Sequence, residues 1–565
     1  MGIIFTIISN YFGVKMPVYV KDSVDQFMSE SSFNTLEDVI ILSVKLGGIY
    51  MLLSLLKGFF LFLMRQTIIV MSRLIEFDLK NEIFKQYQIL DTGFYKRNST
   101  GDLMNRISED VSQVRMYLGP GVMYSINLVV LFFMVIFQMI QISPMLTLYV
   151  LIPLPIMSFL IYKVSTQMNL LSGKVQKEQS NLSTIAQEAF SGIRVIKAYN
   201  REKDTWSGFA DSSMNYKSRM MKLVLVNSLF MPTMLFLIGL STLLAIYLGG
   251  LMVYKHEITL GGIVAFIFFV NNLTWPFASI GWVTSIIQRA AASQKRITEF
   301  MKIQPEVVST SYEPFVFKGS VEFSNVSFTY DNTGIEALKN LNFKVEKGET
   351  LAVIGKTGSG KSSIISLLMR QFDPTDGEIK IDHQDLKKIN LETYRNNVGI
   401  VPQDVFLFSD SISNNLKFGA LDEEIEERDL IEYTTQAHVY HNIKEFPDQF
   451  ETILGERGVN LSGGQKQRLS IARVLIRNPK LLLLDDCLSA VDTETEEIIL
   501  RNLSKNEKER TTIIVSHRIS TVRNASRIIV LDKGEIVESG KHTELIKLNG
   551  IYAEMYLKQL ADETP

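Results

Sequence analysis

Apolar residues are concentrated in the first half of the chain, in runs long enough to cross a lipid bilayer. A hydrocarbon layer of about 30 Å takes about 20 helical residues to cross. The first span begins at the initiator methionine without a basic leader or a small-residue cleavage site, so we interpret it as a short membrane helix and not as a signal peptide. The runs predict six membrane helices, near 3–20, 39–64, 118–140, 145–164, 223–252 and 259–288.

The connections between these spans differ in length and in charge. Residues 65–117 and 165–222 are long and polar and keep helical periodicity, which predicts that the membrane helices continue beyond the bilayer as hairpins. With Lys163 at the edge of the second, these two loops contain 18 Lys and Arg residues, whereas the other three contain two, Lys21 and Lys255. Because basic loops stay in the cytoplasm, we expect the long loops and both termini to face the cytosol.

The second half of the chain follows a different pattern. A polar stretch with two prolines runs from about 301 to 317, and short β-rich segments then alternate with helical ones. Uninterrupted apolar strands of this kind predict a parallel sheet that helices cover on both faces. We therefore predict a six-helix transmembrane domain over 1–300, a linker over 301–317 and a soluble α/β domain over 318–565.

Composition excludes several classes of protein. The 565 residues are 46% hydrophobic and carry a net charge of −2, so no basic field exists to bind nucleic acid, which we exclude as a partner. One cysteine, Cys487, rules out an internal disulfide, a CxxC redox site and a cysteine-rich metal site. Lys57 is a charge inside the second span, which predicts an anionic substrate, a lipid headgroup or a side chain that reaches toward water.

A phosphate-binding loop follows the apolar strand at 351–354. The run from Gly355 to Ser362 matches the pattern GxxxxGK[ST] between a strand and a helix. Its glycines let successive backbone N–H groups and the helix N-terminus point at a β-phosphate. We expect Lys361 to neutralise β- and γ-phosphate oxygens and the Ser362 hydroxyl to ligate Mg²⁺. The predicted ATP-binding residues of this loop are Gly355, Lys356, Thr357, Gly358, Ser359, Gly360, Lys361, Ser362 and Ser363.

A pair of carboxylates, Asp485 and Asp486, follows the buried strand at 481–484. Ligands bind at the carboxyl ends of the strands in an α/β sheet, so Asp485 is expected to hold Mg²⁺ beside the phosphate loop. The two elements together predict a P-loop nucleotide hydrolase.

Further motifs point to one family. The pentapeptide LSGGQ at 461–465 precedes the acidic strand by about twenty residues, Gln403 and His517 each follow a strand, and Tyr330 lies upstream. In order and spacing, essentially the whole second half resembles the nucleotide-binding domain of ABC transporters. The first half resembles the six-helix membrane domain of bacterial ABC exporters, and the nearest likeness is to multidrug-resistance-like half transporters.

This resemblance implies a role for each motif. Tyr330 would stack on adenine, Gln403 would contact Mg²⁺ and the attacking water, and His517 would reach the γ-phosphate. The LSGGQ element closes over the ATP of the opposite subunit in this family, so two chains would form two shared ATP sites. Helix tips at 101–106 and 191–199 would contact the ATPase domains, the second one on the partner. The LSGGQ residues assigned to ATP are Ser462, Gly463, Gly464 and Gln465.

One position departs from the family pattern. Members usually carry a glutamate after the strand aspartate, as the base that orients the hydrolytic water, and here that residue is Asp486. A displacement of about 1 Å can cost on the order of a hundredfold in rate, so the shorter carboxylate predicts a slow site. Either the chain pairs with a different half transporter that carries the glutamate, or two identical chains pair and Asp486 supports hydrolysis.

The predicted function is ATP-driven export of amphipathic small molecules across the cytoplasmic membrane by one half of a dimeric exporter. A homodimeric lipid flippase is the alternative, and lipid-stimulated ATPase activity without drug stimulation would favour it. An ATP-gated channel is a third function, which single-channel conductance would reveal. The sequence leaves no room before the first span for the amphipathic elbow helix that usually precedes it in such exporters.

Overall fold

The computed structural model describes residues 1–28, 36–421, 424–455, 458, 460–505 and 510–563. The chain forms two compact units. One consists of Met1–Gln88 and Gly101–Ile303, and the other of Ile89–Thr100 and Gln304–Pro565. Residues 89–100 therefore belong to the second unit, although the predicted boundaries assign them to the membrane domain.

The first unit is helical. Within the described residues it has six helical stretches that are long and apolar enough to cross a membrane, which confirms the predicted number. The first, α1, has 27 residues and is longer than the short helix that the sequence predicted. The helices are α1 (Gly2–Met28), α2 (Leu36–Ile89), α4 (Thr100–Asn105), α5 (Val111–Met116), α6 (Val122–Ile142), α7 (Pro144–Leu151), α8 (Pro153–Ser191), α9 (Ile193–Ala198), α10 (Glu202–Tyr254) and α11 (Leu260–Met301), with π-helical turns η1 (Arg106–Asp110) and η2 (Tyr117–Gly121) flanking α5.

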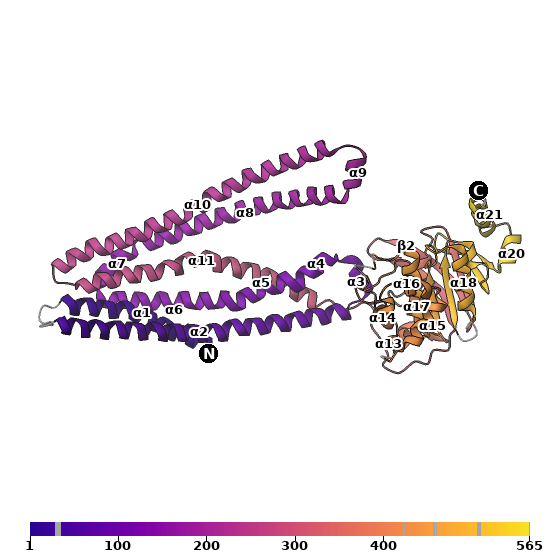
Figure 1. The fold of residues 1–565 in the computed structure, drawn as a ribbon, viewed down its shortest axis with the longest axis horizontal. Helices are drawn as coiled ribbons and strands as arrows, with labels where there is room; N and C mark the ends of the chain where they lie inside the picture. The colour runs from indigo at the N-terminus through magenta and orange to yellow at the C-terminus, as the bar shows by residue number, and fades with distance from the viewer. Residues whose placement is uncertain (29–35, 422–423, 456–457, 459, 506–509, 564–565) are drawn as a thin grey trace. The chain divides into compact units, whose positions relative to one another are not determined.

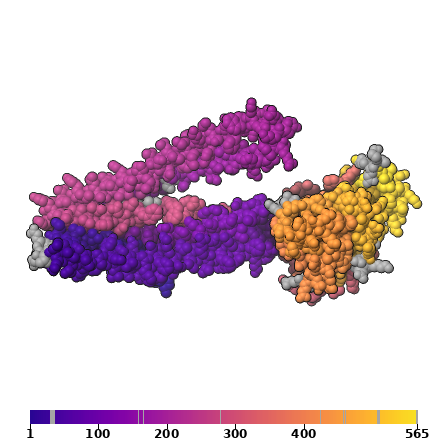
Figure 2. Space-filling model, viewed as in Figure 1, coloured from indigo at the N-terminus to yellow at the C-terminus, as the bar shows by residue number. Residues whose placement is uncertain are grey.

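Two of the helices form the long hairpin that the periodicity predicted. α8 and α10 run side by side, and the six-residue helix α9 joins their far ends (Figure 1). Gly192 begins this turn, and its N–H donates to the carbonyl of Glu188 at 2.8 Å. The end of the hairpin that carries α9 stands apart from the other helices of this unit (Figure 2). Its side chains are therefore available for contact with another molecule.

Lys57 lies on α2 against a glycine of α1. A Cβ atom built on Gly13 would be 3.3 Å from Cε of Lys57 and 3.4 Å from its Nζ, so the glycine makes room for the lysine side chain. The Ser9 hydroxyl donates to the Lys57 carbonyl at 3.1 Å, and Asn10 donates to Asn127 at 2.9 Å beside it. Lys57 has no ion pair with any residue that the structure describes.

The second unit contains two sheets. The antiparallel sheet has the order β2-β1-β4-β5, and the six-stranded sheet has the order β10-β9-β3-β8-β7-β6 and is parallel except at β10. This confirms the predicted α/β fold of the second half. The strands are β1 (Val321–Tyr330), β2 (Ile335–Val345), β3 (Thr350–Gly355), β4 (Asp376–Ile381), β5 (Gln384–Asp385), β6 (Val398–Val401), β7 (Leu481–Asp485), β8 (Thr511–Ser516), β9 (Arg527–Asp532) and β10 (Glu535–Gly540).

The central strands β3, β7 and β8 are buried along their whole length, as continuous apolar strands covered on both faces must be. Helices pack against the sheet and bury leucine and isoleucine side chains on it. The helices of this unit are α3 (Thr92–Arg97), α12 (Lys361–Leu368), α13 (Leu391–Asn396), α14 (Ile412–Lys417), α15 (Glu427–Gln436), α16 (Tyr440–Glu445), α17 (Gly463–Ile476), α18 (Thr493–Ser504), α19 (Ile519–Val522), α20 (His542–Lys547) and α21 (Ile551–Glu563).

Candidate functional site

Three neighbouring parallel strands bring the predicted site residues together. β8 pairs with β3 on one side and with β7 on the other, so the carboxyl ends of all three strands lie at one edge of the sheet. The phosphate loop follows β3, and His517 follows β8. Asp485 is the last residue of β7, and Asp486 comes directly after it. Residues far apart in the sequence therefore meet where ligands bind in α/β sheets.

The phosphate loop has the backbone conformation that its glycines permit. Gly358 and Gly360 have φ angles of 80° and 100°, a left-handed region that other residues rarely adopt. A Cβ on Gly360 would also lie 2.3 Å from the carbonyl oxygen of Ala337, so a side chain would clash there. The hydroxyl of Ser359 is buried and lacks a hydrogen-bond partner within the described residues. A bound phosphate oxygen would provide that partner.

The ammonium group of Lys361 is held inside this loop. It donates to the carbonyl oxygens of Gly355 and Lys356 at 2.8 and 2.9 Å. Burial lowers the pKa of Lys361, while the nearby carboxylates of Asp486 and Asp485 act in the opposite direction. A desolvated cation without a direct carboxylate partner is well suited to bind phosphate oxygens.

Ser362 and Asp485 meet next to the lysine. The Ser362 hydroxyl donates to Asp485 Oδ1 at 3.0 Å, and burial raises the pKa of the Asp485 carboxyl, opposed by that hydrogen bond. No group of three or more His, Cys, Asp or Glu that could hold a metal occurs in the described residues. Mg²⁺ does not need one beside a nucleotide, because one carboxylate, a hydroxyl, waters and phosphate oxygens complete its octahedral shell. The residues present therefore fit Mg²⁺.

Asp486, which departs from the family pattern, contacts His517, the residue predicted to reach the γ-phosphate. His517 Nδ1 lies 2.8 Å from Asp486 Oδ1. Asp486 has a left-handed backbone with φ 47°, and its N–H donates to the carbonyl of Val515 on β8 at 2.8 Å. This backbone turn directs the short carboxylate at the imidazole. The sequence placed both residues in the site, although nothing in it indicated this contact.

Most of the predicted residues line one cavity of about 530 Å³. Ser363 lines it and its hydroxyl is 3.1 Å from the Tyr330 hydroxyl. Among the described residues, the cavity is not lined by Gly355, Lys356 or any of Ser462 to Gln465. The predicted residues that line it are Tyr330, Thr357, Gly358, Ser359, Gly360, Lys361, Ser362, Ser363, Gln403, Asp485, Asp486 and His517; Glu336, Lys339, Lys533 and Gly534 line it as well and were not predicted.

The LSGGQ element forms the start of a separate helix. Ser462 caps α17, because its hydroxyl accepts from the Gln465 N–H at 3.2 Å while the Gln465 side chain accepts from the Ser462 N–H at 2.9 Å. A Cβ on Gly464 would lie 2.8 Å from the carbonyl oxygen of Ala490, so a residue with a side chain would clash at this position. A capped N-terminus of a 14-residue helix attracts an anion, so a second phosphate-directed surface lies outside the cavity.

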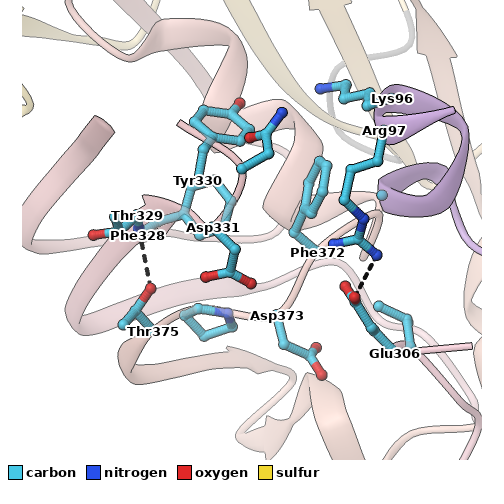
Figure 3. Close-up of a pocket in the computed structure, with 14 residues that line it drawn as sticks. Lys96, Arg97, Glu306, Phe328, Thr329, Tyr330, Asp331, Phe372, Asp373 and Thr375 are labelled. Atoms are coloured by element: carbon cyan, nitrogen blue, oxygen red, sulfur yellow. Dashed lines mark hydrogen bonds and ion pairs between the residues drawn. The ribbon is translucent and has the colours of Figure 1, made fainter. Parts of the chain in front are cut away.

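A cation that the sequence did not indicate lies beside the predicted adenine-binding ring. Lys96 on α3 has its Nζ 5.2 Å from the ring centre of Tyr330 and 4.8 Å from that of Phe372 (Figure 3). Arg97 pairs with Glu306 in the same cavity, which has a volume of about 320 Å³. Tyr330 lines this cavity and the phosphate cavity as well.

Comparison with known proteins identifies the class that this fold and site define. The transmembrane region of ABC transporters matches residues 1–277, and the ABC transporter ATPase domain matches residues 338–489. The chain belongs to the ABC transporter family, in which a membrane domain and an ATP-hydrolysing domain are fused in one polypeptide.

The similar proteins are bacterial exporters. The chain is 37% identical to the probable multidrug resistance ABC transporter ATP-binding/permease protein YheI of Bacillus subtilis, over 86% of this chain and 83% of that one. It is 36% identical to the multidrug resistance-like ATP-binding protein MdlA of Escherichia coli with the same coverage, and 33% identical to the ATP-dependent lipid A-core flippase of Syntrophus aciditrophicus over 86% and 80%. A bacterial Atm1-family ABC exporter solved with ATP bound has a TM-score of 0.81 at 25% identity, covering 100% of this chain and 98% of that one.

Proposed function

We propose that this chain is one half of a two-chain exporter that uses ATP to move amphipathic small molecules out across the cytoplasmic membrane. Its ATPase domain and both termini lie in the cytosol in this proposal, as the basic long loops favour. The observation that supports a two-chain assembly is the separation of the motifs, since LSGGQ lies outside the cavity that the phosphate loop lines. ATP in that cavity is completed by the LSGGQ element of a second chain.

Each residue of the cavity has a part in this proposal. Tyr330 stacks on the adenine, and Lys361 and the N–H groups of the phosphate loop hold the β- and γ-phosphates. Asp486 orients the attacking water, and His517 donates to the γ-phosphate while its other ring nitrogen faces Asp486. Ser362, Asp485 and Gln403 hold Mg²⁺, which neutralises the charge that develops on the phosphate oxygens when it is bound.

The second chain is proposed to be a different half transporter that carries glutamate at the position of Asp486. In this heterodimer, the site with Asp486 mainly holds ATP and the other site hydrolyses it. The contact of His517 Nδ1 with Asp486 Oδ1 at 2.8 Å supports this view, because it engages one of the two carboxylate oxygens that Asp486 can direct at the attacking water. A homodimeric lipid flippase is the alternative, favoured by the likeness to a lipid A-core flippase.

In this proposal, the hairpin of α8 and α10 couples ATP binding to a conformational change of the membrane domain. Apolar side chains are exposed around α9, with Phe190, Val195 and Tyr199 at 78%, 61% and 77%. An exposed apolar cluster of this kind is typical of a protein interaction site. We propose that it contacts the ATPase domain of the second chain, so that closure around ATP changes the access of the transport cavity.

The substrate class is tested by ATP hydrolysis in lipid nanodiscs of defined composition. Amphipathic drugs should raise the hydrolysis rate, and varying the lipid headgroup should change it little. Stimulation by lipid alone would instead establish the flippase. A conductance that ATP gates in planar bilayers would contradict both.

Substitution of Asp486 by asparagine tests the assignment of the slow site. ATP binding should be unchanged, because Lys361 and the loop N–H groups remain, and turnover of the heterodimer should fall only modestly. Equilibrium binding of a fluorescent ATP analogue and steady-state hydrolysis measure the two effects. Complete loss of hydrolysis in the heterodimer would contradict the role of this site in holding ATP.

A further inference from the structure

His517 follows β8 on a short turn that leads into α19. Its side chain is 52% exposed, so packing does not fix the direction of the imidazole. That direction depends on the backbone of residues 516–519, from which the ring reaches Asp486 at 2.8 Å. Whatever holds this backbone therefore determines where the imidazole points.

A glutamine from the last helix of the chain binds this turn on both sides of His517. The Gln559 side chain donates from Nε2 to the His517 carbonyl oxygen at 2.6 Å, and its Oε1 accepts from the Ile519 N–H at 2.8 Å. The two bonds use the donor and the acceptor of a single amide. A side chain without both groups, or a shorter one, cannot make the same pair.

The helix that carries Gln559 is anchored to the sheet, so the amide has a fixed origin. α21 buries Tyr552 completely in a cluster that includes Ile519 and Val522 of α19. The Glu538 carboxylate on β10 accepts from the N–H groups of Ile551 and Tyr552 at the start of the helix. Gln559 lies seven residues after Tyr552, about two helical turns, and so on the same face of α21.

The opposite side of the turn is tied to the segment after the acidic strand. Arg518 donates to the Val491 carbonyl at 3.2 Å and to the Glu496 carboxylate at 3.4 Å. Glu496 is buried and also accepts from the Thr521 hydroxyl. The turn is thus held between the segment that contains α18 and the helix α21.

We propose that Gln559 is a positioning residue for ATP hydrolysis, which fixes the backbone of His517 so that the imidazole faces Asp486 and the γ-phosphate. The inference rests on the proposed function, since it assumes that His517 acts on ATP. It makes the C-terminal helix part of the hydrolytic site, although α21 contributes no residue to the lining of the phosphate cavity within the described chain.

The test compares three variants in the full-length protein, reconstituted in lipid with the lysine of the other phosphate loop replaced, so that the measured kcat reports the site of this chain. Gln559→Leu removes both hydrogen bonds, and Gln559→Glu keeps the acceptor for Ile519 but places a second acceptor against the His517 carbonyl. Lys558→Leu is the matched control on the exposed neighbour. Because a shift of about 1 Å can cost on the order of a hundredfold, kcat should fall about tenfold or more in both Gln559 variants, with KM for ATP changed less than about twofold. The control should match the wild type.

A double-mutant comparison separates this inference from the proposed function. In a His517→Ala background, Gln559→Leu should cause no further loss, because its effect passes through His517. If Gln559→Leu lowers kcat by the same factor with or without His517, or leaves kcat unchanged while His517→Ala lowers it, the inference is wrong and the proposed function stands. If His517→Ala itself leaves kcat unchanged, the proposed role of His517 fails and the inference with it.

Discussion

Replacement of Lys361 by alanine is expected to weaken ATP binding at this site by about a hundredfold or more and to stop hydrolysis there. The ammonium is positioned by the carbonyls of Gly355 and Lys356 and is desolvated before ATP arrives. A hydrogen bond to a charged group contributes about 1.5 to 3 kcal/mol, so the loss of two phosphate contacts corresponds to at least about two orders of magnitude in Kd.

The adjacent lysine provides the control for this prediction. Lys356 is in the same loop, but its side chain is exposed and does not line the phosphate cavity. Lys356→Ala should change the Kd for ATP by less than about threefold, as titration with a fluorescent ATP analogue would show. Equal losses in the two variants would mean that general positive charge, and not the position of Lys361, binds the phosphates.

Lengthening the carboxylate, in Asp486→Glu, is expected to raise hydrolysis at the site of this chain by ten- to a hundredfold. The added methylene moves the carboxylate forward by more than about 1 Å, the scale of displacement that costs about a hundredfold. The longer side chain should also loosen the contact with His517, because the distance of 2.8 Å between His517 Nδ1 and Asp486 Oδ1 depends on the short aspartate side chain.

This measurement requires an assembly in which only one site works. The lysine of the other phosphate loop is replaced, so that single-turnover hydrolysis reports the site built on Lys361 of this chain. Cys487→Ser, a substitution at the next position that leaves both aspartates in place, is the control. A rate that is unchanged or lower with glutamate would show that Asp486 is adapted to hydrolysis, as the homodimer interpretation requires.

The sequence predicted the parts of the site that depend on local patterns. The phosphate loop, the acidic strand end and LSGGQ are contiguous motifs whose chemistry depends on residues a few positions apart. Six apolar runs likewise predicted six spans, because length and hydropathy are local properties. Parallel strands then brought Lys361, Asp485 and His517 to one edge, as the alternation of strands and helices indicated.

Contacts between distant side chains could not be predicted in this way. Gln559 binds the backbone of His517 from 42 residues away, and a glutamine on an amphipathic helix has no local signature of such a contact. Lys96 is more than 200 residues from Tyr330 in the sequence and reached its ring only because α3 packs with the ATPase unit. The direct pair of Asp486 and His517 depends on a left-handed backbone at Asp486, which residue type alone did not indicate.

The measurement that tests the two-chain ATP site most directly is ATP-dependent disulfide formation across it. One cysteine replaces Ser462 in this chain, and the other is placed in the phosphate loop of the second chain, at Thr357 if the chains are identical. We predict a disulfide between the chains that forms with ATP and Mg²⁺ and is absent when the lysine of that phosphate loop is replaced by alanine. If ATP is bound and hydrolysed while no bond forms between the chains, ATP is not held between them and the account is wrong.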